Sequence, residues 1–123
     1  MCELADANTR EPFIRDGFDL VSAAYASIPR TPDHLGVHNL LDAVAPNGTL
    51  FILSHDLDAM RDPKHQLRPF DPDAYLHSGD FVAVLKATPA WTIEINDKRT
   101  RPAGSASAVN YADDRVLRAR RLE

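Results

Sequence analysis

The sequence has a single cysteine and no long hydrophobic run. Cys2 alone cannot form a disulfide within the chain, so no disulfide framework defines the fold. The longest apolar runs have the length of a strand, far below the roughly 20 residues that cross a bilayer as a helix. No basic segment followed by an apolar core and a cleavage site stands at the N-terminus. We therefore expect a cytoplasmic protein that has no membrane partner.

Positive charge is also in short supply. The 123 residues carry a formal net charge of −4 at pH 7, whereas a general nucleic-acid binder needs a basic face that neutralises phosphates. The arginines between positions 115 and 121 form a short basic end, but no aromatic residues are interleaved with them, so the stacking platform of a single-strand binder is missing. We expect no nucleic-acid partner and assign these arginines no ligand.

The chain does contain two strand-sized apolar segments separated by a helical pattern. Its length is typical of one small domain, and no repeat or linker divides residues 1–123. Residues 18–24 and 49–54 are apolar runs without alternation, which is typical of parallel strands buried on both faces. Residues 33–45 between them have apolar side chains at helical spacing, Asp33 suited to the N-cap, and a Pro-Asn-Gly sequence that ends the helix. Ligands of such sheets bind at the carboxyl ends of the strands.

The second half of the chain predicts a looser arrangement. Residues 55–72 are polar and include three prolines, so we expect an exposed irregular connection. The second half of 73–86 has a helical pattern. Residues 91–96 alternate as a half-exposed strand, 113–120 offer another strand, and 101–110 suit a flexible loop between the two.

The two apolar strands resemble the fourth and fifth strands of class I S-adenosylmethionine-dependent methyltransferases. In that family an Asp-Leu-Val strand, here residues 19–21, precedes a helix and a Leu-x-Pro-x-Gly-x-Leu strand, here residues 44–50. Residues 3–7 resemble the end of the third strand. The glycine-rich loop after the first strand and the acidic residue that ends the second have no counterpart. The resemblance therefore implies the second half of an enzyme that is inactive alone. Its α/β fold would be part of a Rossmann-like methyltransferase sheet, mainly parallel, with an antiparallel C-terminal strand pair.

The resemblance also implies where S-adenosyl-L-methionine binds. Asp6 corresponds to a residue that accepts a hydrogen bond from the adenine amino group, and Ala7 leaves room for the ring. Ser22 and Ala23 lie where the fourth strand opens towards the methionine portion. Because aspartate favours turns, a solvated turn residue explains Asp6 equally well.

Two residues that follow the strands are candidates for catalysis. Tyr25 either lines the reaction site or packs under the next helix. His55 directly follows the second strand, and an imidazole can take up a proton near neutrality. The alternative is a non-catalytic histidine that begins a surface loop. Asp56 would at best orient the imidazole ring. Methyl transfer is an in-line displacement that depends mainly on positioning, so the residues do not identify the acceptor.

The acceptor that we expect is a small molecule. Family members that methylate exocyclic amino groups of bases have Asn-Pro-Pro-Tyr or Asp-Pro-Pro-Tyr after the fourth strand. This chain has Ser-Ala-Ala-Tyr at residues 22–25, which disfavours base methylation.

Two other interpretations stay open. His34 and His38 have a spacing that can chelate a metal on a helix, but Leu35 stands where the zinc-hydrolase motif needs a glutamate, so we expect no metal. In the family's strand order, 3-2-1-4-5-7-6, a chain without the first two strands leaves the edge of strand 18–24 unpaired. The non-catalytic alternative is therefore an interaction module that forms a homodimer or pairs with a complementing chain at this edge.

Overall fold

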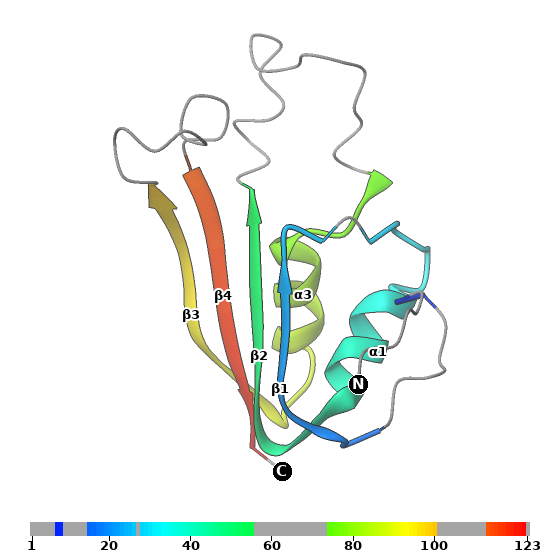
Figure 1. Cartoon of the computed structure of the whole chain (residues 1–123). Coiled ribbons are helices and arrows are strands. Elements are labelled where there is room, and N and C mark those ends of the chain that lie inside the picture. Colours follow the sequence, from blue (N-terminus) through cyan, green and yellow to red (C-terminus); the bar gives the residue numbers. More distant parts are fainter. Residues whose placement is uncertain (1–6, 9–14, 27, 56–73, 101–112, 123) are drawn as a thin grey trace, which may run out of the picture.

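A computed structural model gives the structure of residues 7–8, 15–26, 28–55, 74–100 and 113–122. This part of the chain forms a four-stranded sheet and two helices (Figure 1). The strands are β1 (Phe18–Ala24), β2 (Val44–His55), β3 (Trp91–Thr100) and β4 (Asp113–Arg121), and the helices are α1 (Leu35–Ala43) and α3 (Ser78–Lys86). The predicted connection after His55 and the predicted loop 101–110 lie outside the described residues.

The sheet has the strand order β1-β2-β4-β3. β1 and β2 are parallel and are joined through α1, so the predicted strand-helix-strand unit is confirmed. β4 runs antiparallel between β2 and β3, which confirms the closing antiparallel pair. The expectation of a mainly parallel sheet is wrong for the described residues, because one neighbouring pair is parallel and two are antiparallel.

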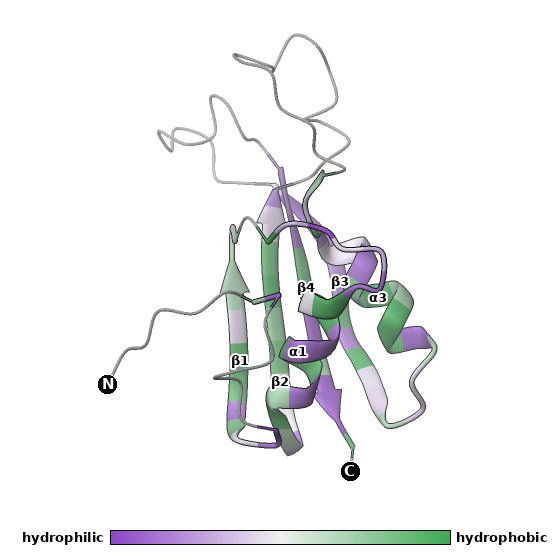
Figure 2. Cartoon of the chain, turned by 90° about the vertical axis from the view of Figure 1, so that its right-hand side faces the viewer, coloured by the Kyte–Doolittle hydropathy of each residue, from purple (hydrophilic) through white to green (hydrophobic). Residues whose placement is uncertain are grey.

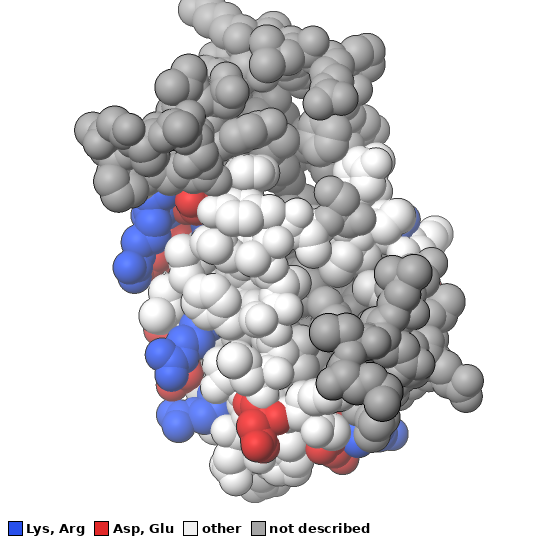
Figure 3. Space-filling view, in the orientation of Figure 1, with Lys and Arg blue, Asp and Glu red and all other residues white. Residues whose placement is uncertain are grey.

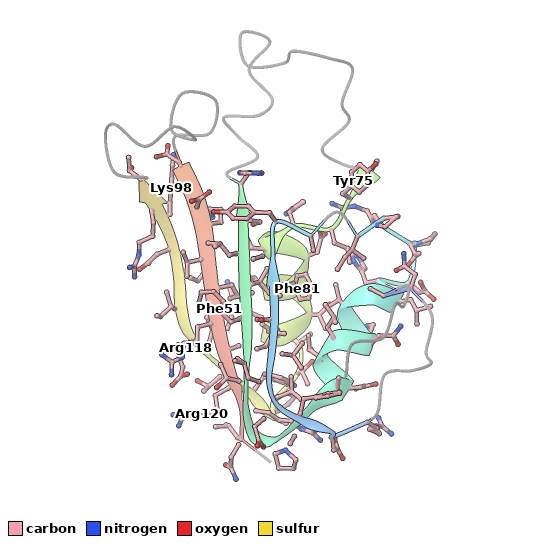
Figure 4. The ribbon with its side chains drawn as sticks, viewed as in Figure 1. Phe51, Tyr75, Phe81, Lys98, Arg118 and Arg120 are labelled. Carbon is pink, nitrogen blue, oxygen red and sulfur yellow. The ribbon has the colours of Figure 1, made fainter. Side chains whose placement is uncertain are left out.

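The hydrophobic core lies between the two helices and one face of the sheet (Figure 2). Side chains alternate along a strand, so Leu50 and Ile52 on β2 point to the same face as Leu117 and Ala119 on β4. Phe81 on α3 packs against this face (Figure 4). Burial of each large apolar side chain contributes about 1.5–3 kcal/mol to stability. The buried apolar cluster comprises Val37, Leu40, Leu41, Val44, Leu50, Ile52, Leu76, Phe81, Leu85, Leu117 and Ala119.

The opposite face, here called the open face, is covered by no helix of the described part of the chain (Figure 1). On β1, Leu20 is 60% exposed and Phe18 is 46% exposed. The expectation that residues 18–24 are buried on both faces is therefore wrong. Apolar composition predicts that such a strand needs covering, but it cannot tell whether the same chain supplies the cover.

The open face changes character from β1 to β4. Arg118 and Arg120 on β4 both contact Glu94 on β3, at 3.3 and 3.1 Å, and both point away from the helices (Figure 4). Charged side chains gather on the side of the molecule formed by β3 and β4, whereas the surface over β1 is largely uncharged (Figure 3). The half of the open face next to β1 is thus the apolar half.

The start of α1 differs from the prediction. The helix begins at Leu35, and Asp33 is not its N-cap. His34 takes the N-cap position in the left-handed conformation, with a φ of 52° and no side-chain cap hydrogen bond. Thr31 caps the first turn of the helix instead, because its Oγ1 accepts a hydrogen bond from the Leu35 amide at 3.0 Å. The same hydroxyl donates to Asp33 Oδ1 at 2.7 Å.

β2 is longer than predicted. It begins at Val44 rather than at position 49, because the backbone becomes extended there, with φ −76° and ψ 127°. Asn47 then takes a positive φ of 66°, which asparagine tolerates better than most residues. Gly48 lies close to β1, since a Cβ at this position would be 3.0 Å from the carbonyl oxygen of Asp19. The turn that the sequence predicts is therefore built into the start of the strand.

No helix in the described part of the chain is long and apolar enough to cross a membrane.

Candidate functional site

The carboxyl ends of β1 and β2 meet the start of β4 at one edge of the sheet. β1 pairs with β2 up to Ala24 and Leu53, and the Tyr25 amide then donates to the Leu53 carbonyl at 2.8 Å. β4 runs antiparallel to β2, so its early residue Asp114 lies opposite His55. The pairing thus brings together Tyr25, His55 and Asp114, which are far apart in the sequence.

The Asp114 carboxylate joins the two predicted catalytic residues. The Tyr25 hydroxyl donates a hydrogen bond to Asp114 Oδ2 at 3.0 Å, and His55 Nδ1 lies 3.7 Å from Asp114 Oδ1. The two rings stack, with centroids 4.6 Å apart and planes inclined by 30°. Asp114 is only 8% exposed, whereas Tyr25 is 41% exposed and the His55 side chain 27%. A buried carboxylate therefore stands behind an accessible phenol and imidazole, an arrangement that can hold and move a proton.

The backbone of Tyr25 explains how its ring reaches His55. Tyr25 has a φ of 53°, a left-handed conformation that costs a residue other than glycine about 1–3 kcal/mol. This conformation breaks the alternation of β1 directly after the strand ends. The ring stacks on His55 and is partly exposed. It is therefore not buried under α1, which was the alternative that the sequence left open.

The predicted cofactor residues lie at separate places. Ser22 and Ala23 are consecutive on β1 and so face opposite sides of the sheet. Ser22 is exposed, whereas Ala23 packs against the core. Ala7 lies beside α1, where its carbonyl accepts a hydrogen bond from Asn39 Nδ2 at 2.8 Å. Asp6 lies outside the described residues. The cofactor roles of these four residues stay predictions.

A small pocket opens on the helix side of the same edge. It has a volume of about 20 Å³ and is lined mainly by apolar side chains, including Ala23, Ile52 and Phe81. Ser54 also lines it, and the buried Ser54 Oγ has no hydrogen-bond partner among the described residues. Such a volume suits roughly one water molecule. Drug-sized ligands need about 300 Å³ or more, so this pocket cannot hold the cofactor.

The segment after β1 is fixed against the start of α3, which supplies one wall of this pocket. Arg30 donates from Nη1 to Asp80 Oδ1 at 2.7 Å and from Nη2 to the Tyr75 carbonyl at 3.1 Å. Asp80 Oδ2 accepts the His77 amide at 2.9 Å, so the same carboxylate caps the helix. The Asp80 side chain is 7% exposed. Arg30 was not predicted from the sequence, because a lone arginine in a proline-rich loop carries no motif.

The described residues contain no group of three side chains that could hold a metal ion. His34 lies before the first residue of α1, in a left-handed conformation, and His38 is exposed on the helix. The spacing of the two histidines suggested that both lie on the helix. In the structure only His38 does.

Asp114 is the site residue that the sequence analysis missed. The predicted orienting residue, Asp56, lies outside the described residues, whereas the structure places the carboxylate of Asp114 beside His55. A signal was available in the sequence. The last strand was expected to close the sheet in an antiparallel sense, and such a strand next to β2 brings its first residues to the end of β2. Those residues, 113 and 114, are both aspartates.

The fold of this chain is similar to part of several solved structures. One comes from work on the conversion of a disulfide bond into a thioacetal group during echinomycin biosynthesis. It matches with a TM-score of 0.60 and 19% identity, over 97% of this chain and 55% of that chain. Another is the YcgJ protein of Bacillus subtilis, with a TM-score of 0.53 and 14% identity, over 95% of this chain and 69% of that chain. No family model and no curated protein matches the sequence.

Both solved structures are methyltransferase-like proteins. At these identities the likeness concerns the fold alone. The chain is thus a small α/β domain with a four-stranded mixed sheet and two helices, and it spans about half the length of the first of these structures.

Proposed function

We propose that this chain is the acceptor side of an S-adenosylmethionine-dependent methyltransferase domain that acts on a small molecule, and that it is inactive alone. The observation that carries the proposal is the strand order β1-β2-β4-β3, with its one parallel and two antiparallel pairs. This order corresponds to the 4-5-7-6 end of the order expected for class I methyltransferases. In such sheets ligands bind at the carboxyl edge, where Tyr25 and His55 lie.

The carboxyl end of β1 supports a cofactor site on the sheet. S-adenosyl-L-methionine supplies a methyl group on a positively charged sulfur. Ser22 and Ala24 are small and exposed at the carboxyl end of β1, so they leave room for a ligand there. The sequence offers no glycine-rich loop and no acidic residue for the ribose hydroxyls, so the rest of the site comes from elsewhere. We therefore propose weak cofactor binding by this chain.

The two candidate catalytic residues have different roles in this proposal. His55 accepts the proton that the acceptor loses during transfer. Tyr25, whose ring stacks on His55 and is 41% exposed, lines the place of the acceptor. Both act by position and proton transfer, and neither forms a covalent bond to the methyl group.

Calorimetric titration of S-adenosylhomocysteine into the chain tests the proposal. We expect weak but saturable binding that Asp6→Ala abolishes, if Asp6 accepts the adenine amino group. Asp19→Ala, at the amino end of β1, is the matched control and is expected to bind as the wild type does. A wild-type chain that takes up no S-adenosylhomocysteine would contradict the proposal.

A second candidate function rests on the edge of β1. Within the described residues β1 pairs with β2 on one side and with no strand on the other. Leu20 and Phe18 add exposed apolar area along this edge, at 60% and 46% exposure. Unpaired edges of this kind accept another strand. The alternative is a non-catalytic module that pairs through β1 with a second copy or with a complementing chain.

A further inference from the structure

The two ring nitrogens of His55 have different surroundings. Nδ1 faces the buried Asp114 carboxylate at 3.7 Å, which favours a hydrogen on Nδ1 and leaves the lone pair on Nε2. The distance is longer than a hydrogen bond. Catalytic contacts in structures without a substrate are often long and tighten when the substrate binds.

Asp114 is itself held in place. Tyr25 donates to Oδ2 at 3.0 Å, so Oδ1 remains directed towards His55. The stacking of the Tyr25 and His55 rings limits rotation of the imidazole. On the other side of β4, Arg99 is the cross-strand partner of Asp114, and its guanidinium contacts Asp97 at 3.4 Å. The Asp114 carboxylate is therefore held on the His55 side of β4 by the Tyr25 hydroxyl and the His55 ring.

We propose that Asp114 is the positioning residue of His55 and that the acceptor at this site is a hydroxyl compound of the phenol class. This inference rests on the proposed methyl transfer. Phenols ionise near pH 10, so at neutral pH a phenol must lose its proton to become a good nucleophile. A thioether or a tertiary amine has no proton to lose, and a site for either would need no carboxylate-held imidazole. The site thus favours an acceptor that loses a proton during methylation, and among such acceptors we propose the phenols.

The transfer step balances with these residues. The phenol oxygen forms a bond to the methyl carbon while the bond from that carbon to sulfur breaks, and its electron pair stays on sulfur. The phenol proton goes to His55 Nε2. The resulting imidazolium lies beside the Asp114 carboxylate, which stabilises its positive charge. Asp114 itself keeps its charge throughout.

NMR of the ring nitrogens tests the positioning role without any cofactor. We expect neutral His55 in the wild type to carry its hydrogen on Nδ1. Asp114→Asn is expected to change the ratio of the two tautomers about tenfold, the effect of losing one charge-assisted contact. Asp114→Glu keeps the carboxylate and should restore the wild-type ratio. A wild type with its hydrogen on Nε2, or an unchanged ratio in Asp114→Asn, would overturn the role, and the wild-type result stands even if a variant fails to fold.

Binding of phenol and toluene tests the acceptor class. The two rings have similar shape, but only phenol can donate a hydrogen bond to Nε2. We expect phenol to bind about 3- to 10-fold more tightly than toluene at Tyr25 and His55, as one hydrogen bond allows. His55→Ala should abolish this preference, and His38→Ala, an exposed change on α1, should keep it. Equal binding of the two probes to the wild type would overturn the acceptor class.

These two tests are independent of the proposed function. A chain that fails to bind S-adenosylhomocysteine but prefers phenol and shows the expected tautomer would lose the methyl transfer and keep the proton-transfer site. The reverse result would keep the methyltransferase and remove Asp114 and the phenol.

Discussion

Two carboxylates, Asp80 and Asp114, are the charged groups buried in the described part of the chain, and both lie near the carboxyl edge of the sheet. A buried carboxylate without a partner is costly, so each of them needs one. Arg30, which is always charged, pairs with Asp80 at the start of α3. Tyr25 and His55 face Asp114, and His55 can gain and lose a proton. Asp80 therefore has the features of a structural ion pair, whereas Asp114 has those of a proton-transfer site.

The ion pair between Arg30 and Asp80 predicts that Arg30→Ala lowers the stability of the fold strongly. The change leaves Asp80 buried with fewer partners and removes the hydrogen bond from Arg30 to the Tyr75 carbonyl. We expect a loss of about 1–3 kcal/mol in the free energy of unfolding, measured by urea denaturation. Arg15→Ala is the control, because its 3.8 Å contact with Asp42 is 69% exposed on the arginine side and is worth about 0–1 kcal/mol. Equal losses in the two variants would contradict the structural role of Arg30.

The position of a single residue was predictable where it lies at the end of a predicted strand. Tyr25 directly follows β1 and His55 is the last residue of β2, so their presence at the carboxyl edge follows from the apolar patterns of these strands. Asp114 depends on which strand lies next to β2, and Arg30 on a contact with a residue fifty positions away. The two aspartates that begin the last strand were a signal for Asp114, whereas the contact of Arg30 is set by tertiary structure, which local patterns do not encode.

At the scale of elements, α1 depends on Thr31 rather than on the predicted cap. The Thr31 hydroxyl, through its hydrogen bond, is the largest cause that holds the pKa of Asp33 below the ordinary 3.8 of an aspartate. A lowered folded-state pKa means that Asp33 contributes stability above the ordinary value. That contribution is lost as the pH falls from about 3.8 through the lower value in the folded state.

Thr31→Val therefore has two expected results. Loss of the hydrogen bond to the Leu35 amide should lower the free energy of unfolding by about 1 kcal/mol, as capping changes typically do. NMR titration should show the pKa of Asp33 rising towards its ordinary value, and the stability gap between wild type and variant narrowing in acid. Thr92→Val on β3 is the control, and we expect a change within about 0.5 kcal/mol. An unchanged pKa of Asp33 in Thr31→Val would contradict the assignment.

Gly48→Ala tests the close approach of β1 and β2. A Cβ at Gly48 would lie 2.8 Å from the carbonyl oxygen of Ala45 and 3.0 Å from that of Asp19. Backbone atoms cannot give way easily, so we expect a loss of about 1–3 kcal/mol in thermal or urea unfolding. Gly79→Ala on α3 is the matched control, because among the described residues its close contacts are with the His77 side chain, at 3.1 Å. Alanine favours a helix by up to about 1 kcal/mol, so a Gly48→Ala variant as stable as Gly79→Ala would refute the close packing.

The elements were more predictable than their surroundings. Residues 18–24 form β1 with the predicted bounds, and the helical pattern in the second half of 73–86 became α3. The burial of β1 was not predictable, because an apolar strand reads the same whether its cover lies in this chain or in another. The start of β2 was missed because the apolar spacing of α1 continues into Val44, where the backbone is already extended.

At the scale of the whole molecule, one face of the sheet is covered and the other is open. The exposed β1 edge predicts that the isolated chain self-associates as its concentration rises. We expect Leu20→Lys to shift the chain to the monomer in light scattering, because a lysine on an edge strand opposes pairing. Leu122→Lys is the control, since Leu122 is 47% exposed but follows β4. A wild type that stays monomeric, or association that Leu20→Lys leaves intact, would remove the interaction through β1.

The proposed function puts the cofactor at the carboxyl edge of the sheet, where Tyr25 and His55 lie. NMR mapping of S-adenosylhomocysteine on the wild-type chain tests this proposal most directly. The account predicts saturable shifts of backbone amides at the carboxyl ends of β1 and β2, including Ser22, Tyr25 and His55. No saturable shift, or shifts confined to the amino ends of these strands, would contradict it.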